Sequence, residues 1–87
     1  MNIDAQDVAF GDNGWELVEY ECEEHDSDGE SISVVSRHTE SGRFFSVWYS
    51  VCFRVGGLAD IGEPYEVEPY EELIPAEVVT RWKAVEL

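Results

Sequence analysis

Residues 44–55, FFSVWYSVCFRV, are the stretch of this sequence that most directly decides the fold. Apolar side chains recur at every second position, and a period of two predicts a β-strand with two distinct faces. Phe44 and Trp48 place large rings on the second face, so the strand is expected to need cover on both sides. The pair Gly56-Gly57 is expected to end it. The first face carries Phe45, Val47, Tyr49, Val51, Phe53 and Val55.

Upstream segments predict partner strands for this central one. From Val18 to Glu23, apolar and acidic residues alternate strictly, which predicts a half-buried strand with one face in water. Residues 32–39 predict the next strand, followed by a turn over 40–43 with Gly42 in the left-handed region. Asn13-Gly14, after the strand-like residues 8–10, predicts a two-residue hairpin loop.

The C-terminal third is acidic and contains prolines at regular spacing. Residues 63–66 and 68–71 repeat the sequence EPYE, and prolines at this spacing predict an extended, partly polyproline-like segment over residues 60–75. Residues 76–87 fit either a strand or a short helix after Pro75, and their β-branched content favours a strand. The expected fold is therefore all-β or mostly β: a small antiparallel meander of four to five strands, with a short C-terminal helix as the alternative to the last strand.

Length and charge exclude several classes of protein. The 87 residues suit one domain spanning residues 1–87, and 20 Asp and Glu against 5 Lys and Arg give a net charge of −15. Such a charge excludes direct binding to nucleic acid or to an anionic membrane through phosphate neutralisation. The chain has no apolar run long enough for a membrane helix and no signal-peptide pattern at its start, so a cytoplasmic location is expected.

The two cysteines predict no special chemistry. Cys22 and Cys52 are expected to be buried free thiols, with a structural disulfide as the alternative. The sequence contains no CxxC motif, and His25 and His38 lack metal-ligand spacing, so a zinc site is not expected. No nucleophile elbow, phosphate-binding loop or dinucleotide motif is present, so we expect neither an enzyme nor a bound cofactor.

The negative charge is concentrated in two blocks that contain no lysine or arginine. Residues 16–30 carry −8 and residues 60–77 carry −7, whereas residues 31–59 between them carry +2. Glutamates two apart on a strand lie roughly 6.7 Å apart, which is about two phosphate steps of roughly 3.4 Å along a DNA strand. A rigid row of carboxylates could therefore take the place of nucleic acid in a basic groove, although exposed glutamates are also typical of a merely solvated face.

Tyrosines set among these acids suggest contacts to a protein. Tyr65 and Tyr70 could place their rings on a partner while carboxylates meet its basic residues, or could fold back over Trp48 and Phe44. The predicted partner-binding residues are Glu19, Glu21, Glu23, Glu24, Asp26, Asp28, Tyr65, Glu66, Glu68, Tyr70 and Glu71.

A cation site is a weaker prediction. Glu24, Asp26, Asp28 and Gly29 match positions one, three, five and six of an EF-hand loop. Position twelve, which requires a bidentate glutamate, is Val35, and no helices are expected beside the loop. A solvated hairpin loop is therefore favoured, and a weak divalent-cation-binding domain stays an alternative.

Three segments carry a resemblance to a known class of protein. Residues 13–18, the aromatic strand 44–53 and the ending 75–82 resemble small acidic proteins of tailed bacteriophages, and size and charge are similar to those of phage anti-defence proteins, including anti-restriction and anti-CRISPR DNA mimics. The resemblance implies action in the bacterial cytoplasm on a host or defence protein. The two acidic blocks further predict that the chain is an inhibitor and that this partner is a basic nucleic-acid-binding protein. A protein–protein adaptor or virion accessory module is the alternative, and a sheet this small with two apolar faces also suits a homodimer.

Overall fold

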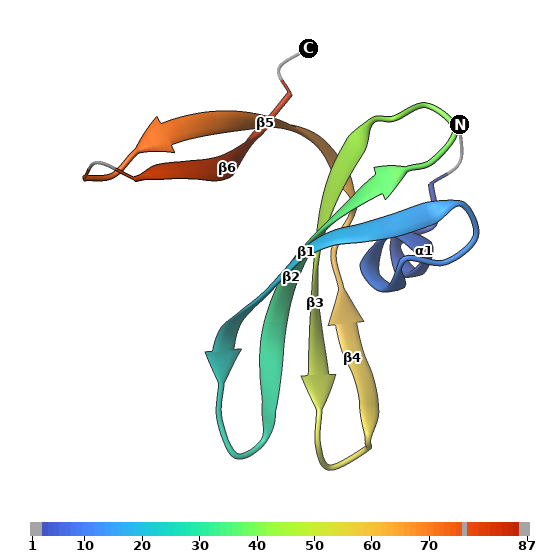
Figure 1. Ribbon diagram of the computed structural model, residues 1–87. Helices are drawn as coiled ribbons and strands as arrows, with labels where there is room; N and C mark the ends of the chain where they lie inside the picture. The colour runs from blue at the N-terminus through green and yellow to red at the C-terminus, as the bar shows by residue number, and fades with distance from the viewer. Residues whose placement is uncertain (1–2, 76, 86–87) are drawn as a thin grey trace.

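The computed structural model describes residues 3–75 and 77–85, which form one short helix and one antiparallel sheet (Figure 1). The predicted mostly β fold is confirmed, with one strand more than expected and with the helix at the N-terminal end. The elements in order are α1 (Ala5–Phe10), β1 (Trp15–His25), β2 (Gly29–His38), β3 (Phe44–Cys52), β4 (Gly57–Ile61), β5 (Tyr65–Leu73) and β6 (Val78–Ala84).

The sheet departs from a simple meander because two strands share one edge of β3. The strand order is β1-β2-β3-β5-β6, and β4 also pairs with β3. β4 occupies the half of that edge from Tyr49 to Cys52, whereas β5 occupies the half from Phe44 to Ser46. β5 then continues beyond Val67 with β6 as its partner, so the two strands form a C-terminal hairpin that leaves the rest of the sheet.

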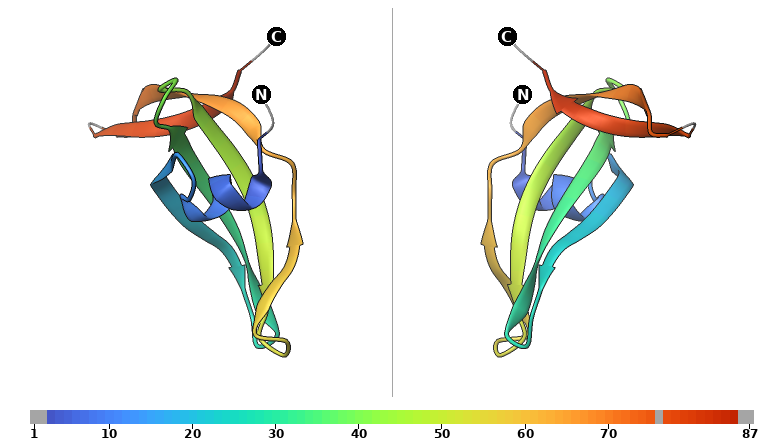
Figure 2. Two further views of the ribbon diagram at one scale, coloured as in Figure 1. Left: turned by 90° about the vertical axis from the view of Figure 1, so that its right-hand side faces the viewer. Right: turned by 90° about the vertical axis from the view of Figure 1, so that its left-hand side faces the viewer.

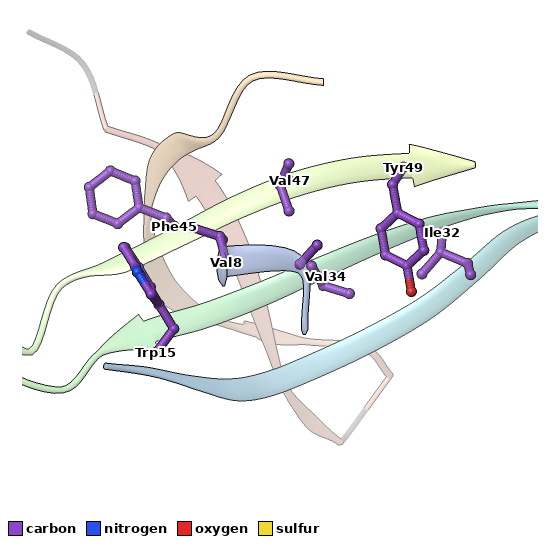
Figure 3. Close-up of a cluster of buried hydrophobic side chains, with 8 residues drawn as sticks. Val8, Trp15, Ile32, Val34, Phe45, Val47 and Tyr49 are labelled. Atoms are coloured by element: carbon purple, nitrogen blue, oxygen red, sulfur yellow. The ribbon is translucent and has the colours of Figure 1, made fainter. Parts of the chain in front are cut away.

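The hydrophobic core lies between α1 and one face of the sheet, called here the helix-covered face (Figure 3). Val8 of α1 is fully buried against Val34 of β2 and Val47 of β3. The Ser36 hydroxyl, also buried, donates to the Val8 carbonyl oxygen at 2.5 Å and ties the helix to the sheet. The remaining buried members of this core are Ala9, Trp15, Ile32, Phe45 and Tyr49.

The N-terminal segment is a helix, so the predicted strand over residues 8–10 is wrong. The Asp4 side chain accepts a hydrogen bond from the Gln6 amide at 2.8 Å and caps the first turn, while Gly11 ends the helix at φ 66°. Asn13 and Gly14 do adopt positive φ as predicted, yet their turn joins the helix to β1 rather than strand to strand. Three apolar residues are too few to distinguish a strand from a buried helical turn.

β1 is neither strictly alternating nor half-buried. Its pairing with β2 shifts at Val18 and again at Glu23, which are the extra residues of two β-bulges. Glu19 and Glu21 therefore share a face, opposite Val35 and Ser33, whereas Glu23 has no partner in the register. Every residue of β1 after Trp15 is exposed, because α1 is too short to cover this edge strand.

β3 is shorter than predicted, whereas residues 78–84 form the strand favoured for the segment 76–87, of which residues 76, 86 and 87 lie outside the described part of the chain. Phe53 and Val55 lie in the turn after β3, 48% and 76% exposed, and Gly56 closes that turn at φ 68°. The segment over 60–75 is largely the regular strand β5 rather than polyproline-like. Pro69 fits there because β5 has a single neighbour at that point, so one edge needs no amide donor.

The C-terminal hairpin and α1 lie on opposite sides of the sheet (Figure 2). The face away from α1, called here the open face, presents Ser33, Val35, Ser46 and Trp48. The radius of gyration is 14.2 Å, against about 12 Å expected for a compact chain of this length, because the hairpin projects outward. Within the described residues, no helix has the length and apolarity to cross a membrane.

Candidate functional site

A single tryptophan holds the C-terminal hairpin against the open face. The Trp82 ring of β6 lies 4.9 Å from the Phe44 ring of β3, centroid to centroid, in a tilted contact. The indole Nε1 of Trp82 donates a hydrogen bond to the carboxylate of Glu19 on β1. Trp82 therefore joins strands from both ends of the sequence, and it covers Phe44, for which the sequence suggested Tyr65 and Tyr70 as one alternative. Trp48 stays 37% exposed.

An ion pair and one buried valine fix the base of the hairpin. The Arg43 guanidinium donates from two nitrogens to the Glu66 carboxylate, with Nε at 2.8 Å from one oxygen. These hydrogen bonds, with the positive charge of Arg43, hold the pKa of Glu66 below its ordinary value. Val67 is buried beside the pair, and the Val85 amide donates to the Glu66 carbonyl oxygen at 2.9 Å.

The hairpin and the open face enclose a groove of about 550 Å³, named here the acidic groove. Its floor includes Ser33, Val35 and Ser46, and one wall is the β1 edge. The opposite wall comes from β5 and β6. Five predicted partner-binding residues line this groove together: Glu19, Glu21, Glu23, Tyr65 and Tyr70.

The electrostatics of the groove follow from how the few basic residues are used. All five lysines and arginines of the chain lie within 4.0 Å of a carboxylate. Arg81, the one basic residue lining the groove, has its Nε 2.6 Å from Glu72. Within residues 3–75 and 77–85, Glu19, Glu21 and Glu23 form no ion pair, so their charges face the groove uncompensated. The pairs are Arg37–Glu16, Arg43–Glu66, Arg54–Asp28, Arg81–Glu72 and Lys83–Glu68.

The predicted residues at the β1–β2 turn lie in a different place. Glu24, Asp26 and Asp28 line a smaller hollow beside β3, away from the acidic groove. The Asp26 carboxylate accepts from the Asp28 and Gly29 amides at 2.8 and 3.0 Å, and Asp28 lies 3.3 Å from Arg54. Both carboxylates are thus engaged within the chain, which favours the solvated hairpin loop over a calcium loop.

The predicted acids of β5 are also outside the groove. Glu66 and Glu68 form ion pairs with Arg43 and Lys83, so their charges are compensated within the chain. Glu71 is exposed and lies opposite Thr80 of β6 in the hairpin register. The acidic block at residues 16–30 therefore supplies the carboxylates of the groove, and the block at residues 60–77 supplies its two tyrosine rings.

Sequence reasoning missed Trp82 as a groove residue, and it misjudged the cysteines. Trp82 was expected as a strand residue, but its contact with Glu19 joins positions 63 residues apart, which no local pattern encodes. Both cysteines are free, as favoured, but Cys22 is exposed and Cys52 half-buried rather than buried. Cys22 also lies beside His25 and Glu30, a grouping that the spacing rules did not anticipate.

The chain matches no protein-family model, no curated protein sequence and no solved structure. The case for a function therefore rests on the geometry and charge of the acidic groove.

Proposed function

We propose that this protein is an acidic inhibitor that occupies a basic nucleic-acid-binding surface of a host or defence protein in the bacterial cytoplasm, in the manner of phage-encoded nucleic-acid mimics. It acts by binding, with no catalytic step and no cofactor. The observation that carries the proposal is the distribution of ion pairs. All five basic residues, including Arg81 of the groove lining, are paired with other carboxylates, and Glu19, Glu21 and Glu23 of the groove wall form none of these ion pairs.

The spacing of these carboxylates suits a partner that reads a phosphate backbone. Glu19 and Glu21 share a face of β1, so their Cα atoms are roughly 6.7 Å apart, and Glu23 extends the row past the bulge. A cationic cleft that accepts phosphates would exchange them for carboxylates, and its attraction to the groove would act over about 8 Å at physiological salt.

The rings of the opposite wall add a contact that charge alone does not provide. Tyr65 is 53% exposed and Tyr70 is 38% exposed, although both line the groove. Exposed tyrosines beside carboxylates are typical of protein-binding surfaces, because the ring packs on apolar stems while the acids meet basic groups. The groove thus has the composition of a docking site for an arginine-rich or lysine-rich surface.

The test is a triple variant, Glu19→Gln, Glu21→Gln and Glu23→Gln, compared with wild type in capture of basic proteins from bacterial lysate at low and high salt. Glutamine keeps an oxygen acceptor for Trp82 Nε1 while removing three charges, so the hairpin stays in place. We expect wild type to retain nucleic-acid-binding proteins at low salt, to release them at high salt, and to lose them to competing duplex or single-stranded nucleic acid.

The matched control carries Glu40→Gln, Glu63→Gln and Glu77→Gln, which removes the same number of charges from exposed positions outside the groove. This control is expected to bind as wild type does. Equal binding by the groove variant and wild type, or binding that competing nucleic acid does not reduce, would overturn the proposal.

A second candidate function is an adaptor or virion accessory module that docks through apolar contact, alone or as a homodimer. It is favoured by exposed large side chains on the helix, the sheet and the hairpin, among them Phe10, Tyr20, Trp48 and Leu73. Apolar docking predicts binding that resists salt and is lost in Trp48→Ala. Light scattering after size exclusion tests the homodimer, and a monomer mass at high protein concentration would remove it.

A further inference from the structure

The turn between β1 and β2 brings together three side chains of distinct metal-binding chemistry. Cys22 Sγ and His25 Nδ1 lie 3.5 and 3.2 Å from the same atom, Glu30 Oε2. One ligand atom from each of the three residues lies within 4.8 Å of the other two. Cys22 and His25 are exposed and Glu30 is half-buried, so the cluster is anchored on one side and open to solvent on the other.

A β-bulge creates this cluster. In a regular strand, residues three apart point to opposite faces, which would separate Cys22 from His25. The bulge at Glu23 inserts one residue, so that Cys22 lies opposite Ile32 and His25 lies opposite Glu30. Ile32 and Glu30 share a face of β2, and Cys22 and His25 therefore share it as well.

The distances match the edges of a tetrahedral metal site. With metal bonds of about 2.3 Å to sulfur and about 2.0–2.1 Å to nitrogen and oxygen, neighbouring ligands lie about 3.5 Å apart for the sulfur–oxygen edge and about 3.3 Å for the nitrogen–oxygen edge. The observed 3.5 and 3.2 Å agree with both values. Two of the three edges of the site therefore already have the lengths that a bound ion requires, and the third is no longer than 4.8 Å where the grouped ligand atoms are concerned.

We propose that Cys22, His25 and Glu30 bind one divalent transition-metal ion such as zinc, with the fourth coordination position occupied by water. The ligand set selects for the metal, because a thiolate and an imidazole favour zinc over calcium or magnesium, which prefer all-oxygen sites. The site is independent of the acidic groove and does not require the function proposed above.

Binding would proceed by displacement of a proton. In the free protein the Cys22 thiol donates a hydrogen bond to Glu30 Oε2 at 3.5 Å, so the proton to be displaced lies between these two ligands. On binding, Sγ–H releases its proton to solvent and the His25 imidazole adopts the tautomer protonated at Nε2, so that the thiolate, the freed Nδ1 lone pair and the Glu30 carboxylate each donate an electron pair to the ion. The ion then takes the place of the hydrogen bonds that now join the three groups.

The surrounding hairpin is tight enough to hold the ligands in place. The Asp26 amide donates to the Gly29 carbonyl oxygen at 2.9 Å and closes the turn between His25 and Glu30. The His25 ring lies 5.8 Å from the Phe53 ring in the β3–β4 turn. Two neighbouring turns thus support the site, which reduces the ordering that metal binding would otherwise require.

The experiment titrates the reduced full chain with Co²⁺, followed by optical absorption, and with Zn²⁺, followed by calorimetry. We expect one ion per chain and a thiolate-to-cobalt charge-transfer band. Replacing a ligand in Cys22→Ser or His25→Gln should abolish that band or weaken metal binding more than about tenfold. Replacing a residue that only hydrogen-bonds to a metal ligand already weakens binding by at least that factor. Circular dichroism checks that each variant stays folded.

The chain offers matched controls for two ligands. Cys52→Ser removes the other thiol and His38→Gln removes the other imidazole, and each control should bind cobalt as wild type does. Absence of the charge-transfer band in wild type, or its equal loss in Cys52→Ser and Cys22→Ser, would overturn the proposal. Ca²⁺ that competes equally with Zn²⁺ would also contradict it.

Discussion

The helix-covered face and the C-terminal hairpin show two different ways of holding strands in place. The helix-covered face buries a continuous set of apolar side chains around Val8, Val34 and Val47. The hairpin buries Val67 at its base and is otherwise held by the Trp82 contacts and by ion pairs at half-exposed positions. The helix-covered face is therefore expected to contribute most of the free energy of unfolding, whereas the position of the hairpin is expected to be adjustable.

This difference explains where the acidic groove lies. A groove between a rigid sheet and a lightly anchored hairpin can adjust its width to a partner at little expense in stability, whereas a groove within a packed core cannot. Glu19 belongs to the sheet and Trp82 to the hairpin, so their hydrogen bond sets the separation of the two walls. Substitutions in the two regions test this division between a packed face and a lightly anchored hairpin.

Trp15→Ala should produce the largest loss of stability. Trp15 is 8% exposed and packs edge-on against Phe45 at 5.4 Å, so truncation leaves a cavity in the core and should lower the free energy of unfolding by about 3–5 kcal/mol. Chemical denaturation measures it. The matched control is Trp48→Ala on the open face, which should lose much less, and similar losses for the two would contradict the division.

Gly29→Ala should produce the next largest effect. A Cβ at this position would lie 2.1 Å from the Val51 carbonyl oxygen in the pairing of β2 with β3, so the backbone must shift. We expect a loss of about 2–3 kcal/mol in denaturant unfolding. Gly57→Ala on β4 is the control, since its Cβ would meet nothing within 4 Å, and it should be close to neutral.

Trp82→Ala should release the hairpin while leaving the sheet folded. Removing the indole deletes the Phe44 contact and the hydrogen bond to Glu19, and we expect a loss of about 1–2 kcal/mol because the ring is half-exposed. Hydrogen exchange should rise over β5 and β6 and stay slow in β2 and β3. The control is Leu73→Ala, which alters an exposed position of the same hairpin. If Trp82→Ala instead lost protection from hydrogen exchange equally throughout the chain, the hairpin would unfold together with the core, contrary to this prediction.

Glu66→Gln should give the smallest effect, and one that depends on pH. Because Arg43 lowers the pKa of Glu66 in the folded state, the ion pair stabilises the fold above the unfolded pKa of about 4.3, and this contribution is lost as pH falls through the lowered folded value. Thermal unfolding of wild type and variant should differ at neutral pH and converge in acid. A difference that grows in acid would reverse the sign of this linkage.

The sequence correctly predicts the elements whose signals are local. Alternation of apolar residues predicts β2 and β3, and β-branched residues favour the last strand. The glycine in the turn between β2 and β3 predicts the positive φ found at Gly42. Three apolar residues do not reveal that residues 5–10 form a helix, because that choice depends on burial against the sheet. Likewise, Pro64 and Pro69 suggest polyproline geometry until the single-neighbour position of β5 is known.

The candidate site divides in the same way. The sequence identifies the glutamates of β1 and the tyrosines of β5 as surface-binding residues. Their convergence on one groove depends on the hairpin crossing the open face, and the exclusion of Glu66 and Glu68 depends on their ion pairs with Arg43 and Lys83. The bulges in β1 are likewise invisible to a rule that assumes strict alternation.

Charge, β content and the absence of catalytic motifs are thus determined by the sequence alone, because composition and short-range periodicity do not depend on how strands meet. The tertiary structure decides which carboxylates keep an uncompensated charge, which rings face them, and that Cys22, His25 and Glu30 lie together. Those features depend on strand register and on contacts between distant residues, and a one-residue shift in register sends a side chain to the opposite face of the sheet.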